Sequence, residues 1–360
     1  MKILVWHWGR LGAGPRFAAE LAAGFGRLPG TPSLLSLSAQ AELLQSAQSP
    51  APELAIPTYA GLPGLIGRLA GGPLLVRRLA RQLDRLRPDA AVCAMPALLD
   101  FLMVAALRRV GIPYAAVIHD AQHHPGDDLP FQMALQRRLA RHAALLVALS
   151  PYVGACFRQQ GLAHESRLLV ASHPPFRFGT IPARRPHDGP YRLLFFGRLR
   201  RYKGLDLLAA ALARLPAGRF AVRVVGSGPA SPTLAALAAL EGVSVENRWV
   251  PETEIASLLA WADAVVLPYR EASQSGVAAA AIAAGRPVVA TAVGGLAHQL
   301  AGEGLARLSA PEPEALAACL ARLAEEKLPP APLPRSGAEA AWTAFAAEIL
   351  AALTAAPGSR

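Results

Sequence analysis

The sequence predicts an α/β protein with two domains, each built on a parallel β-sheet. Short apolar segments with the length of buried strands alternate with helical segments along the chain, which is the pattern of successive βαβ units. The chain has 360 residues, 53% of them hydrophobic, enough for two buried cores. A proline-rich connector at residues 180–190 interrupts the alternation, which starts again at Tyr191. We therefore expect domains over residues 1–180 and 191–335, and a C-terminal helix over 336–360 that packs back on the first domain.

The first strand, predicted over residues 3–8, runs into a glycine-rich turn before a helix over residues 16–25. Such a turn lets a phosphate approach the backbone in Rossmann-like domains, so Gly12 and Gly14 are candidate binding residues. The spacing does not fit the G-x-G-x-x-G fingerprint, because these glycines are followed by Phe17, and no acidic residue ends a second strand. A nicotinamide-dependent enzyme is therefore disfavoured.

Residues 61–87 are predicted as a loop broken by glycine and proline that leads into a basic amphipathic helix. Leucines and a valine recur at helical spacing, and the other positions hold Arg77, Arg78, Arg81 and Arg85. Such a helix can lie on an anionic membrane surface. It can equally pack on the core and leave its arginines in water, and the sequence alone leaves both interpretations open.

Strands over residues 90–95 and 114–119 flank a helix over residues 98–110. His119 ends the second of these strands, and Asp120 follows it. Because α/β proteins place their sites beyond the carboxyl ends of parallel strands, His119 is a candidate site residue. Further histidines and carboxylates lie at positions 123, 124, 127 and 128, but they have no fixed metal-ligand spacing, so we expect no metal site. A second basic helix over 131–142 and strands over 145–150 and 168–172 complete the domain.

The second domain begins with a strand over residues 191–198 that ends at Gly197 and Arg198. Arg198 and Lys203 lie five positions apart across the turn into a helix over residues 205–215. Arg198 can form a forked pair of hydrogen bonds to a phosphate, and Lys203 can act as a point charge. The next strand, over residues 221–225, ends in a second tight turn at Gly226. Both turns suit a diphosphate ligand.

A polar loop joins a buried strand over residues 264–267 to an alanine-rich helix that ends at Gly285, and a strand over residues 287–291 follows. The loop contains Glu271, Ser273, Gln274, Ser275 and Gly276. A helix N-terminus presents unpaired N–H groups and a partial positive charge to an anion, so this loop can hold a phosphate. Alternatively, Ser273 and Ser275 only cap the helix. Three such loops at the carboxyl ends of strands in one sheet favour the phosphate interpretation.

The net charge is +11, and the first 180 residues carry 18 basic and 10 acidic residues, so +8 of it lies there. A basic face suits nucleic acid, an anionic membrane or a phosphorylated substrate, and it can also follow from a composition rich in alanine, arginine, glycine and proline. The basic helices lack interleaved aromatic residues and no nucleic-acid-binding motif is visible, so we expect no nucleic-acid partner.

Cysteines and hydropathy suggest where the protein resides. The three cysteines, Cys93, Cys156 and Cys319, are far apart and odd in number, which indicates reduced thiols in a cytoplasmic protein. The N-terminal apolar run is too short for a signal peptide, and no segment resembles a membrane span.

The second half resembles the family 4 nucleotide-sugar glycosyltransferases. The resemblance rests on motifs in the family's order and spacing over about a hundred residues: Gly197-Arg198, Tyr202-Lys203-Gly204, the Gly226-Ser-Gly-Pro turn, Leu267-Pro268-Tyr269, and Gly285 to Thr291 followed by Gly294-Gly295-Leu296. The first domain matches more loosely, in its glycine loop and in His119-Asp120. The resemblance implies the GT-B fold, in which two Rossmann-like domains face each other across a cleft.

The resemblance also implies roles for particular residues. Arg198 and Lys203 would bind the donor diphosphate, the Ser273–Gly276 loop would hold the distal phosphate and the sugar, and His119 would face the donor sugar and the acceptor. The implied donor-binding set also includes Gly12, Gly14, Gly197, Gly226, Glu271 and Gln274. Enzymes of this family usually retain the anomeric configuration and need no metal, so we expect no cofactor beyond the nucleotide-sugar substrate.

One departure from the family concerns two glutamates that it commonly carries eight positions apart. Ala272 and Ala280 stand at those places, and His298 stands where many relatives have a carboxylate. Glu271 lies one residue early and could serve as the first glutamate, but the second has no substitute, which puts the contact with the donor ribose in question. A branch of the family with a Gln-Ser-Gly loop is most similar, which favours an active enzyme.

The sequence thus predicts a cytoplasmic glycosyltransferase that moves a hexose from a nucleoside diphosphate sugar to a sugar acceptor. We expect a lipid-linked acceptor or a polysaccharide precursor in cell-surface polysaccharide biosynthesis, with peripheral contact at the inner face of an anionic membrane. A nucleotide-sugar epimerase on the same plan would need carboxylates for proton abstraction, in which these loops are poor. A catalytically silent nucleotide-sugar-binding subunit is the third interpretation, which the two alanines support.

Overall fold

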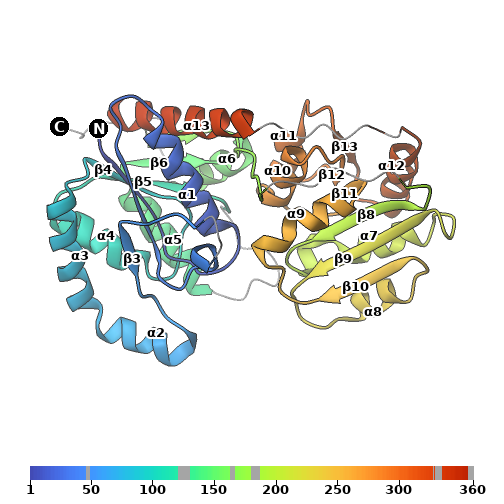
Figure 1. The fold of residues 1–360 in the computed structure, drawn as a ribbon, viewed down its shortest axis with the longest axis horizontal. Helices are drawn as coiled ribbons and strands as arrows, with labels where there is room; N and C mark the ends of the chain where they lie inside the picture. Colours follow the sequence, from blue (N-terminus) through green and yellow to red (C-terminus); the bar gives the residue numbers. More distant parts are fainter. Residues whose placement is uncertain are drawn as a thin grey trace. The chain divides into compact units, whose positions relative to one another are not determined.

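The computed structural model describes residues 1–45, 49–120, 130–162, 167–179, 187–326, 328 and 335–355, the side chains of 130–132 excepted. The described residues form two compact units. The first unit contains those up to Ser172 and those from Glu339 onward, and the second contains those from His173 to Ala338. Each unit has a parallel sheet with helices on both sides (Figure 1). The prediction of two parallel-sheet α/β domains is therefore confirmed.

The sheet of the first unit has seven parallel strands in the order β3-β2-β1-β4-β5-β6-β7. The strands are β1 (Ile3–His7), β2 (Ser33–Ser38), β3 (Leu54–Ile56), β4 (Ala90–Cys93), β5 (Tyr114–Ile118), β6 (Leu145–Ala148) and β7 (Leu168–Val170). The sequence analysis did not predict β2 and β3. In β2, buried Ser36 accepts a hydrogen bond from Trp8 Nε1 at 3.1 Å, so a polar residue occupies a core position.

The helices of the first unit are α1 (Ala13–Gly26), α2 (Gly61–Ala70), α3 (Gly72–Leu86), α4 (Asp100–Arg109), α5 (Pro130–His142), α6 (Pro151–Gln159) and α13 (Arg335–Ala355), with a short 3-10 helix η1 (Glu42–Gln45). Side chains of α3, α4, α5 and α6 join those of Trp6, Cys93 and Ile118 in one core cluster. Because successive side chains of a strand point to opposite faces, His7 and the residue after Ile118 belong to the other face, where α1 packs.

The expectation of a broken loop before the basic helix was wrong, because residues 61–70 form α2. Its only proline, Pro63, stands in the first turn, where the missing N–H costs no helical hydrogen bond. Tyr59 packs against Gly64, and Gly71 ends the helix. No residue of α2 is buried, and the helix extends away from the sheet of its unit (Figure 1).

The C-terminal helix α13 packs on α1. Phe17 meets Trp342 edge to face at 4.9 Å between ring centroids, and the Trp342 carbonyl lies where a side chain at position 24 would be. By length and composition alone α13 could cross a membrane, whereas the sequence analysis found no segment that resembles a membrane span. However, Trp342, Phe345 and Ile349 are buried, so its apolar face is used in the core of the unit.

The sheet of the second unit has six parallel strands in the order β10-β9-β8-β11-β12-β13. The strands are β8 (Tyr191–Phe196), β9 (Phe220–Gly226), β10 (Val243–Asn247), β11 (Ala264–Leu267), β12 (Val288–Thr291) and β13 (Ala306–Ser309). The helices are α7 (Leu205–Leu212), α8 (Pro232–Ala238), α9 (Glu252–Trp261), α10 (Gly276–Ala283), α11 (Gly294–Leu300) and α12 (Pro313–Glu326), with the 3-10 helix η3 (Arg201–Lys203). Helix α7 packs against α8 and α12, and α10 packs against β11 and β12.

Candidate functional site

Three predicted loops meet at one edge of the second sheet. The chain leaves β8 toward β9 and β10 on one side, and it returns to β11 on the other side of β8. The carboxyl ends of β8 and β11 therefore lie side by side at the point where the strand order reverses, which is where open α/β sheets bind ligands. The loops after β8, β9 and β11 all open at this edge, as predicted.

The turn after β8 places Arg198 and Lys203. Gly197 has a φ of 126° and Gly204 a φ of 65°, conformations that L side chains rarely adopt. Arg198 is exposed, and its Nη2 donates a hydrogen bond of 2.7 Å to the hydroxyl of buried Tyr202. The Nζ of Lys203 lies 3.6 Å from the ring centroid of Tyr269. The turn thus holds two cations over two aromatic rings.

Lys203 forms no ion pair in the part of the chain that the structure describes. A cation over an aromatic ring is stabilised by about 0.5 to 2 kcal/mol. That attraction orients the ammonium group without neutralising it, so its charge stays available to an anion.

Glycines bring these loops into direct backbone contact. A side chain at position 226 would collide with the Gly197 carbonyl, and one at position 204 would collide with the Pro268 carbonyl. Gly226 and Gly197 were predicted as donor-binding residues. In the structure they pack the turn after β9 against the turn after β8, and Gly204 packs the turn after β8 against the loop after β11.

The loop after β11 is fixed to its surroundings by Ser275. The Ser275 hydroxyl accepts a hydrogen bond from Ala278 N at 3.2 Å and so caps α10. Gln299 clamps the same residue, since its Oε1 accepts from Ser275 N at 2.7 Å and its Nε2 donates to Ser275 O at 3.0 Å. Ser275 therefore caps α10, and its predicted contact with the donor stays a prediction. The N–H groups of Gly276 and Val277 in the first helical turn have no acceptor within the described residues.

The remaining predicted residues of this loop differ in exposure. Ser273 is buried, Gln274 is half-buried and Glu271 is exposed. Ala272 and Ala280, which stand where the family carries its two glutamates, are 5% and 1% exposed. The methyl groups of Ala272 and Ala280 are packed in the protein interior, and neither position provides a carboxylate.

In the first unit, His119 follows β5 on the face covered by α1. It is buried, its Nε2 lies 3.0 Å from Ala94 O, and Phe17 meets its ring edge to face at 4.7 Å. Since a carbonyl only accepts hydrogen bonds, Nε2 carries the proton and Nδ1 is the acceptor. Burial lowers the pKa of His119 to about 4, so the ring is neutral at neutral pH.

Sequence reasoning missed His7, a second buried histidine at the carboxyl edge of the first sheet. Its Nδ1 lies 2.7 Å from Met95 O, so the proton sits there and Nε2 is left as an acceptor. Burial lowers the pKa of His7 to about 4. The signal in the sequence was a polar residue inside an apolar strand just before the glycine loop.

The His7 side chain explains why two positions of the glycine-rich loop need glycine. Its Nε2 fills the space that a side chain would need at Gly9 or Gly14. Gly12, with a φ of 80°, stands before the first residue of α1 and is exposed. Of the two predicted glycines, Gly12 is open to a ligand and Gly14 is buried over the histidine.

No group of three or more metal-ligating side chains occurs among the residues that the structure describes. The histidines and carboxylates at positions 123, 124, 127 and 128 lie outside the described residues. Cys93, Cys156 and Cys319 are all buried, and no disulfide joins any two of them.

Comparisons with known proteins agree with this architecture. Residues 190–326 match the family model for glycosyl transferases group 1, and residues 12–172 match that for the glycosyl transferase 4-like domain. The chain belongs to the group 1 glycosyltransferases. The predicted family and the prediction of an enzyme, a glycosyltransferase, are thereby confirmed.

The sequence identity to individual relatives is low. This glycosyltransferase is 28% identical over 264 residues to 2-deoxystreptamine glucosyltransferase of Streptomyces kanamyceticus, covering 66% of this chain and 68% of that one. It is 34% identical over 176 residues to D-inositol 3-phosphate glycosyltransferase of Pseudarthrobacter chlorophenolicus, covering 46% of this chain and 41% of that one. The fold matches the crystal structure of Anabaena HepE in complex with UDP-glucose, with a TM-score of 0.68, 20% identity and coverage of 100% and 98% of the two chains.

Proposed function

We propose that this enzyme transfers a hexose from a nucleoside diphosphate sugar to a sugar or lipid-linked acceptor, with retention of configuration. The proposal rests mainly on one observation: Arg198, Lys203 and the free N–H groups of α10 meet at the strand-order reversal of the second sheet. Two cations and a helix N-terminus suit a diphosphate. The related HepE structure contains UDP-glucose, which supports a nucleotide sugar as the donor.

In this proposal, the bond between the anomeric carbon and the diphosphate oxygen breaks, and negative charge develops on the departing diphosphate. Arg198 and Lys203 stabilise that charge, together with the N–H groups of Gly276 and Val277. Preorganised donors of this kind usually supply the largest catalytic effect. The reaction needs no metal in this scheme, because the protein itself supplies the positive charge.

His119 is neutral at neutral pH, and with Nε2 donating to Ala94 O its Nδ1 can only accept. It therefore suits a sugar hydroxyl better than a phosphate. We assign it to positioning the donor sugar or the acceptor, with Gly12 beside the same edge. Glu271, Ser273 and Gln274 remain candidates for contacts with the distal phosphate and the sugar.

Measuring binding and turnover together tests this assignment. Isothermal titration with UDP, GDP and ADP should show saturable binding of at least one nucleoside diphosphate, and its sugar donors should be hydrolysed slowly in the absence of acceptor. Binding without hydrolysis or transfer would favour a silent subunit. Release of an epimerised nucleotide sugar would favour the epimerase.

The acceptor side of the proposal rests on α2 and α3. On α2, Leu62, Ile66 and Leu69 are 68%, 59% and 48% exposed, and they follow i, i+4, i+7 spacing on one side of the helix. On α3, Leu74 is 69% exposed, and several solvent-facing positions of this helix are arginines. An apolar stripe next to a row of arginines suits shallow insertion into an anionic bilayer. We therefore propose peripheral attachment at the inner face of the membrane, where a lipid-linked acceptor or polysaccharide precursor would be available.

Sedimentation with liposomes tests the attachment. The protein should pellet with anionic and not with neutral vesicles at 0.1 M salt and should be released at 1 M, since the Debye length falls from about 10 Å to about 3 Å. The variant Leu62→Asn/Ile66→Asn should stay in the supernatant, whereas Leu308→Asn, at an exposed leucine of the second unit, should pellet normally. Equal recovery of wild type with both lipids would refute the attachment while leaving nucleotide binding untouched.

A further inference from the structure

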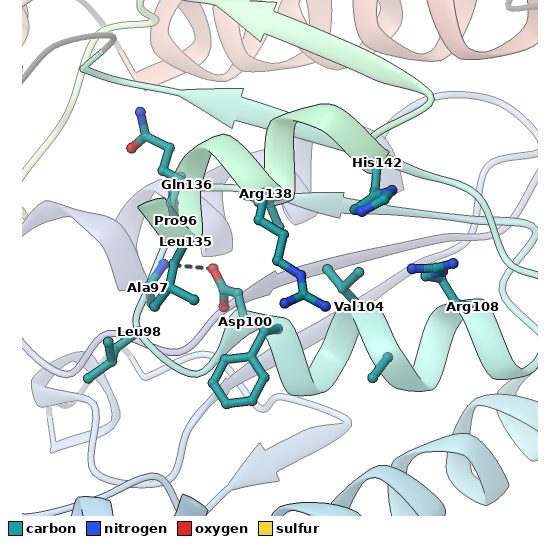
Figure 2. Close-up of a pocket in the computed structure, with 13 residues that line it drawn as sticks. Pro96, Ala97, Leu98, Asp100, Val104, Arg108, Leu135, Gln136, Arg138 and His142 are labelled. Carbon is teal, nitrogen blue, oxygen red and sulfur yellow. Dashed lines mark hydrogen bonds between the residues drawn. The ribbon is translucent and has the colours of Figure 1, made fainter. Parts of the chain in front are cut away.

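A pocket in the first unit lies between α4 and α5. It is lined by residues 96–98, after β4, and by side chains of both helices (Figure 2). Its core side is formed by the cluster that contains Trp6 and Ile118. The side chains of His7 and His119 lie on the opposite face of the sheet and do not line the pocket, although Gln136 of the pocket donates a hydrogen bond of 2.6 Å to Asp120 O, beside His119.

The pocket has a volume of about 160 Å³, whereas one water molecule needs about 10 to 15 Å³. It is therefore large enough for part of an organic ligand. Its walls include apolar residues from both helices and the preceding loop, namely Leu98, Phe101, Val104, Leu135 and Leu139. These side chains can hold an apolar group.

Three side chains that can carry positive charge line the same pocket. Arg108 comes from the last turn of α4, and Arg138 and His142 come from α5. Figure 2 shows Arg138 extending from α5 toward α4, with Arg108 and His142 toward one end of the pocket and Leu98 and Leu135 toward the other. Within the described residues, neither arginine has an ion-pair partner.

The one carboxyl group in the pocket is already engaged. Asp100 accepts hydrogen bonds from Ala97 N at 2.6 Å and from Trp6 Nε1 at 3.1 Å, and Cys93 Sγ lies 3.4 Å away. Burial raises its pKa to about 7, so it is partly neutral near pH 7. Among the described residues Asp100 forms no ion pair with Arg108 or Arg138, so both arginines keep their positive charge.

We propose that this pocket binds an anionic amphiphile, a molecule with a phosphate or carboxylate head and an alkyl chain. The head would lie between Arg108, Arg138 and His142, where charged hydrogen bonds to an anion are available. The chain would lie along Leu98, Phe101 and Leu135. This inference does not depend on the proposed transfer reaction.

Isothermal titration with decyl phosphate, below its micelle concentration, tests the proposal. Decanol and inorganic phosphate serve as the uncharged and the chain-free comparison. Decyl phosphate should bind saturably and at least tenfold more tightly than either comparison, because only it uses both parts of the pocket. Equal affinity for inorganic phosphate would show that the apolar wall is not used, equal affinity for decanol would show that the arginines are not used, and either result would overturn the proposal, as would no binding.

The chain offers matched control variants. Arg108 and Arg138 line the pocket, whereas their neighbours Arg109 and Arg137, also exposed and on the same helices, do not line it. The double variant Arg108→Gln/Arg138→Gln should weaken decyl phosphate binding about ten- to hundredfold, the usual effect of losing charged hydrogen bonds. Arg109→Gln/Arg137→Gln removes the same net charge and should weaken it less than about threefold. Equal losses in both double variants would mean that only the overall charge attracts the ligand.

Leu135→Gln tests the apolar wall with both arginines intact, and it should reduce the advantage of decyl phosphate over inorganic phosphate. Nucleoside diphosphate affinity, measured on the same samples, should be the same in all these variants. If it fell together with decyl phosphate binding, the variants would be acting through general loss of structure, and the pocket assignment would fail.

Discussion

Replacing Lys203 by methionine isolates the charge that the turn after β8 presents. The Lys203 ammonium lies 3.6 Å from the Tyr269 ring centroid and 5.0 Å from that of Tyr202. Methionine keeps an apolar stem of similar length that can pack on the same rings. Since no carboxylate of the described chain pairs with Lys203, the substitution leaves no buried charge behind. The free energy of unfolding should therefore change by less than about 1 kcal/mol.

The effect on the ligand should be much larger. Loss of a charged hydrogen bond to a bound diphosphate costs about 1.5 to 3 kcal/mol, or roughly ten- to 150-fold in Kd. Loss of the same contact to the departing diphosphate costs about 2 to 4 kcal/mol of transition-state stabilisation, or roughly 30- to 1000-fold in kcat/KM. Turnover should therefore fall at least as much as affinity.

The matched control is Arg201→Met, two positions earlier on the same 3-10 helix η3. Arg201 is exposed, and this variant loses the same unit of charge. Nucleoside diphosphate affinity, measured by isothermal titration, should fall less than about threefold in this control, because the charge of an exposed side chain that makes no contact with the ligand is screened by salt. If Lys203→Met bound the nucleotide as tightly as wild type, or no more weakly than Arg201→Met, Lys203 would not contact the diphosphate.

Three further predictions concern residues around the two sites. His119→Gln should reduce transfer at least tenfold while changing nucleoside diphosphate affinity less than about threefold; equal loss of both would mean that His119 only supports the fold. Gly204→Ala should lower the free energy of unfolding by more than about 2 kcal/mol in urea titrations, because a left-handed residue gains a side chain that meets the Pro268 carbonyl; a change below 1 kcal/mol would contradict this. The third concerns pH. His7 and His119 have pKa values lowered to about 4, so the unfolded chain binds more protons between pH 4 and about 6.5, and stability falls as pH falls through that window. The buried Asp100 carboxyl, whose pKa is raised to about 7, has the opposite effect on stability: the folded chain binds the extra proton, so its contribution to stability grows as pH falls from about 7 to about 3.8. Asp100→Asn should therefore steepen the loss of stability between pH 6.5 and 4, and an unchanged slope would contradict the buried-carboxyl assignment.

The strands that lead into the candidate site, β8, β9 and β11, could be predicted because they are mostly apolar runs that end in glycine or proline. The reversal of strand order at β8 then brings the loops with Arg198, Lys203 and Ser275 to one edge. Sequence reasoning therefore found the loops of the candidate site, since parallel strands end at the same edge wherever they stand in the sheet.

Other features depend on contacts that a local pattern does not contain. Gln299 clamps Ser275 from 24 positions away, and nothing near Gln299 in the sequence indicates this. His7 looks like an interruption of a strand until Gly9 and Gly14 are seen to make room for its ring. The strand β2 was missed because Ser36 and Ser38 are buried through hydrogen bonds to Trp8 and Thr58, so the apolar pattern of a strand is broken.

Helix α2 shows a different limit of sequence reasoning. Three glycines and a proline within residues 61–70 lower its helix propensity, and none of its residues is buried. The structure places its exposed leucines and isoleucine on one side, a pattern that depends on the helix forming. The sequence therefore predicted the apolar and basic character of this region and not its shape.

Donor hydrolysis is the most direct test of the central claim, that the carboxyl edge of the second sheet binds and activates a nucleoside diphosphate sugar. Wild type and the double variant Arg198→Ala/Lys203→Ala would be incubated with UDP-, GDP-, ADP- and dTDP-sugars, and the released nucleoside diphosphate would be quantified. The account predicts release from at least one donor by wild type, and release at least a hundredfold slower by a variant that remains folded by circular dichroism. Equal release by wild type and the double variant would contradict the account.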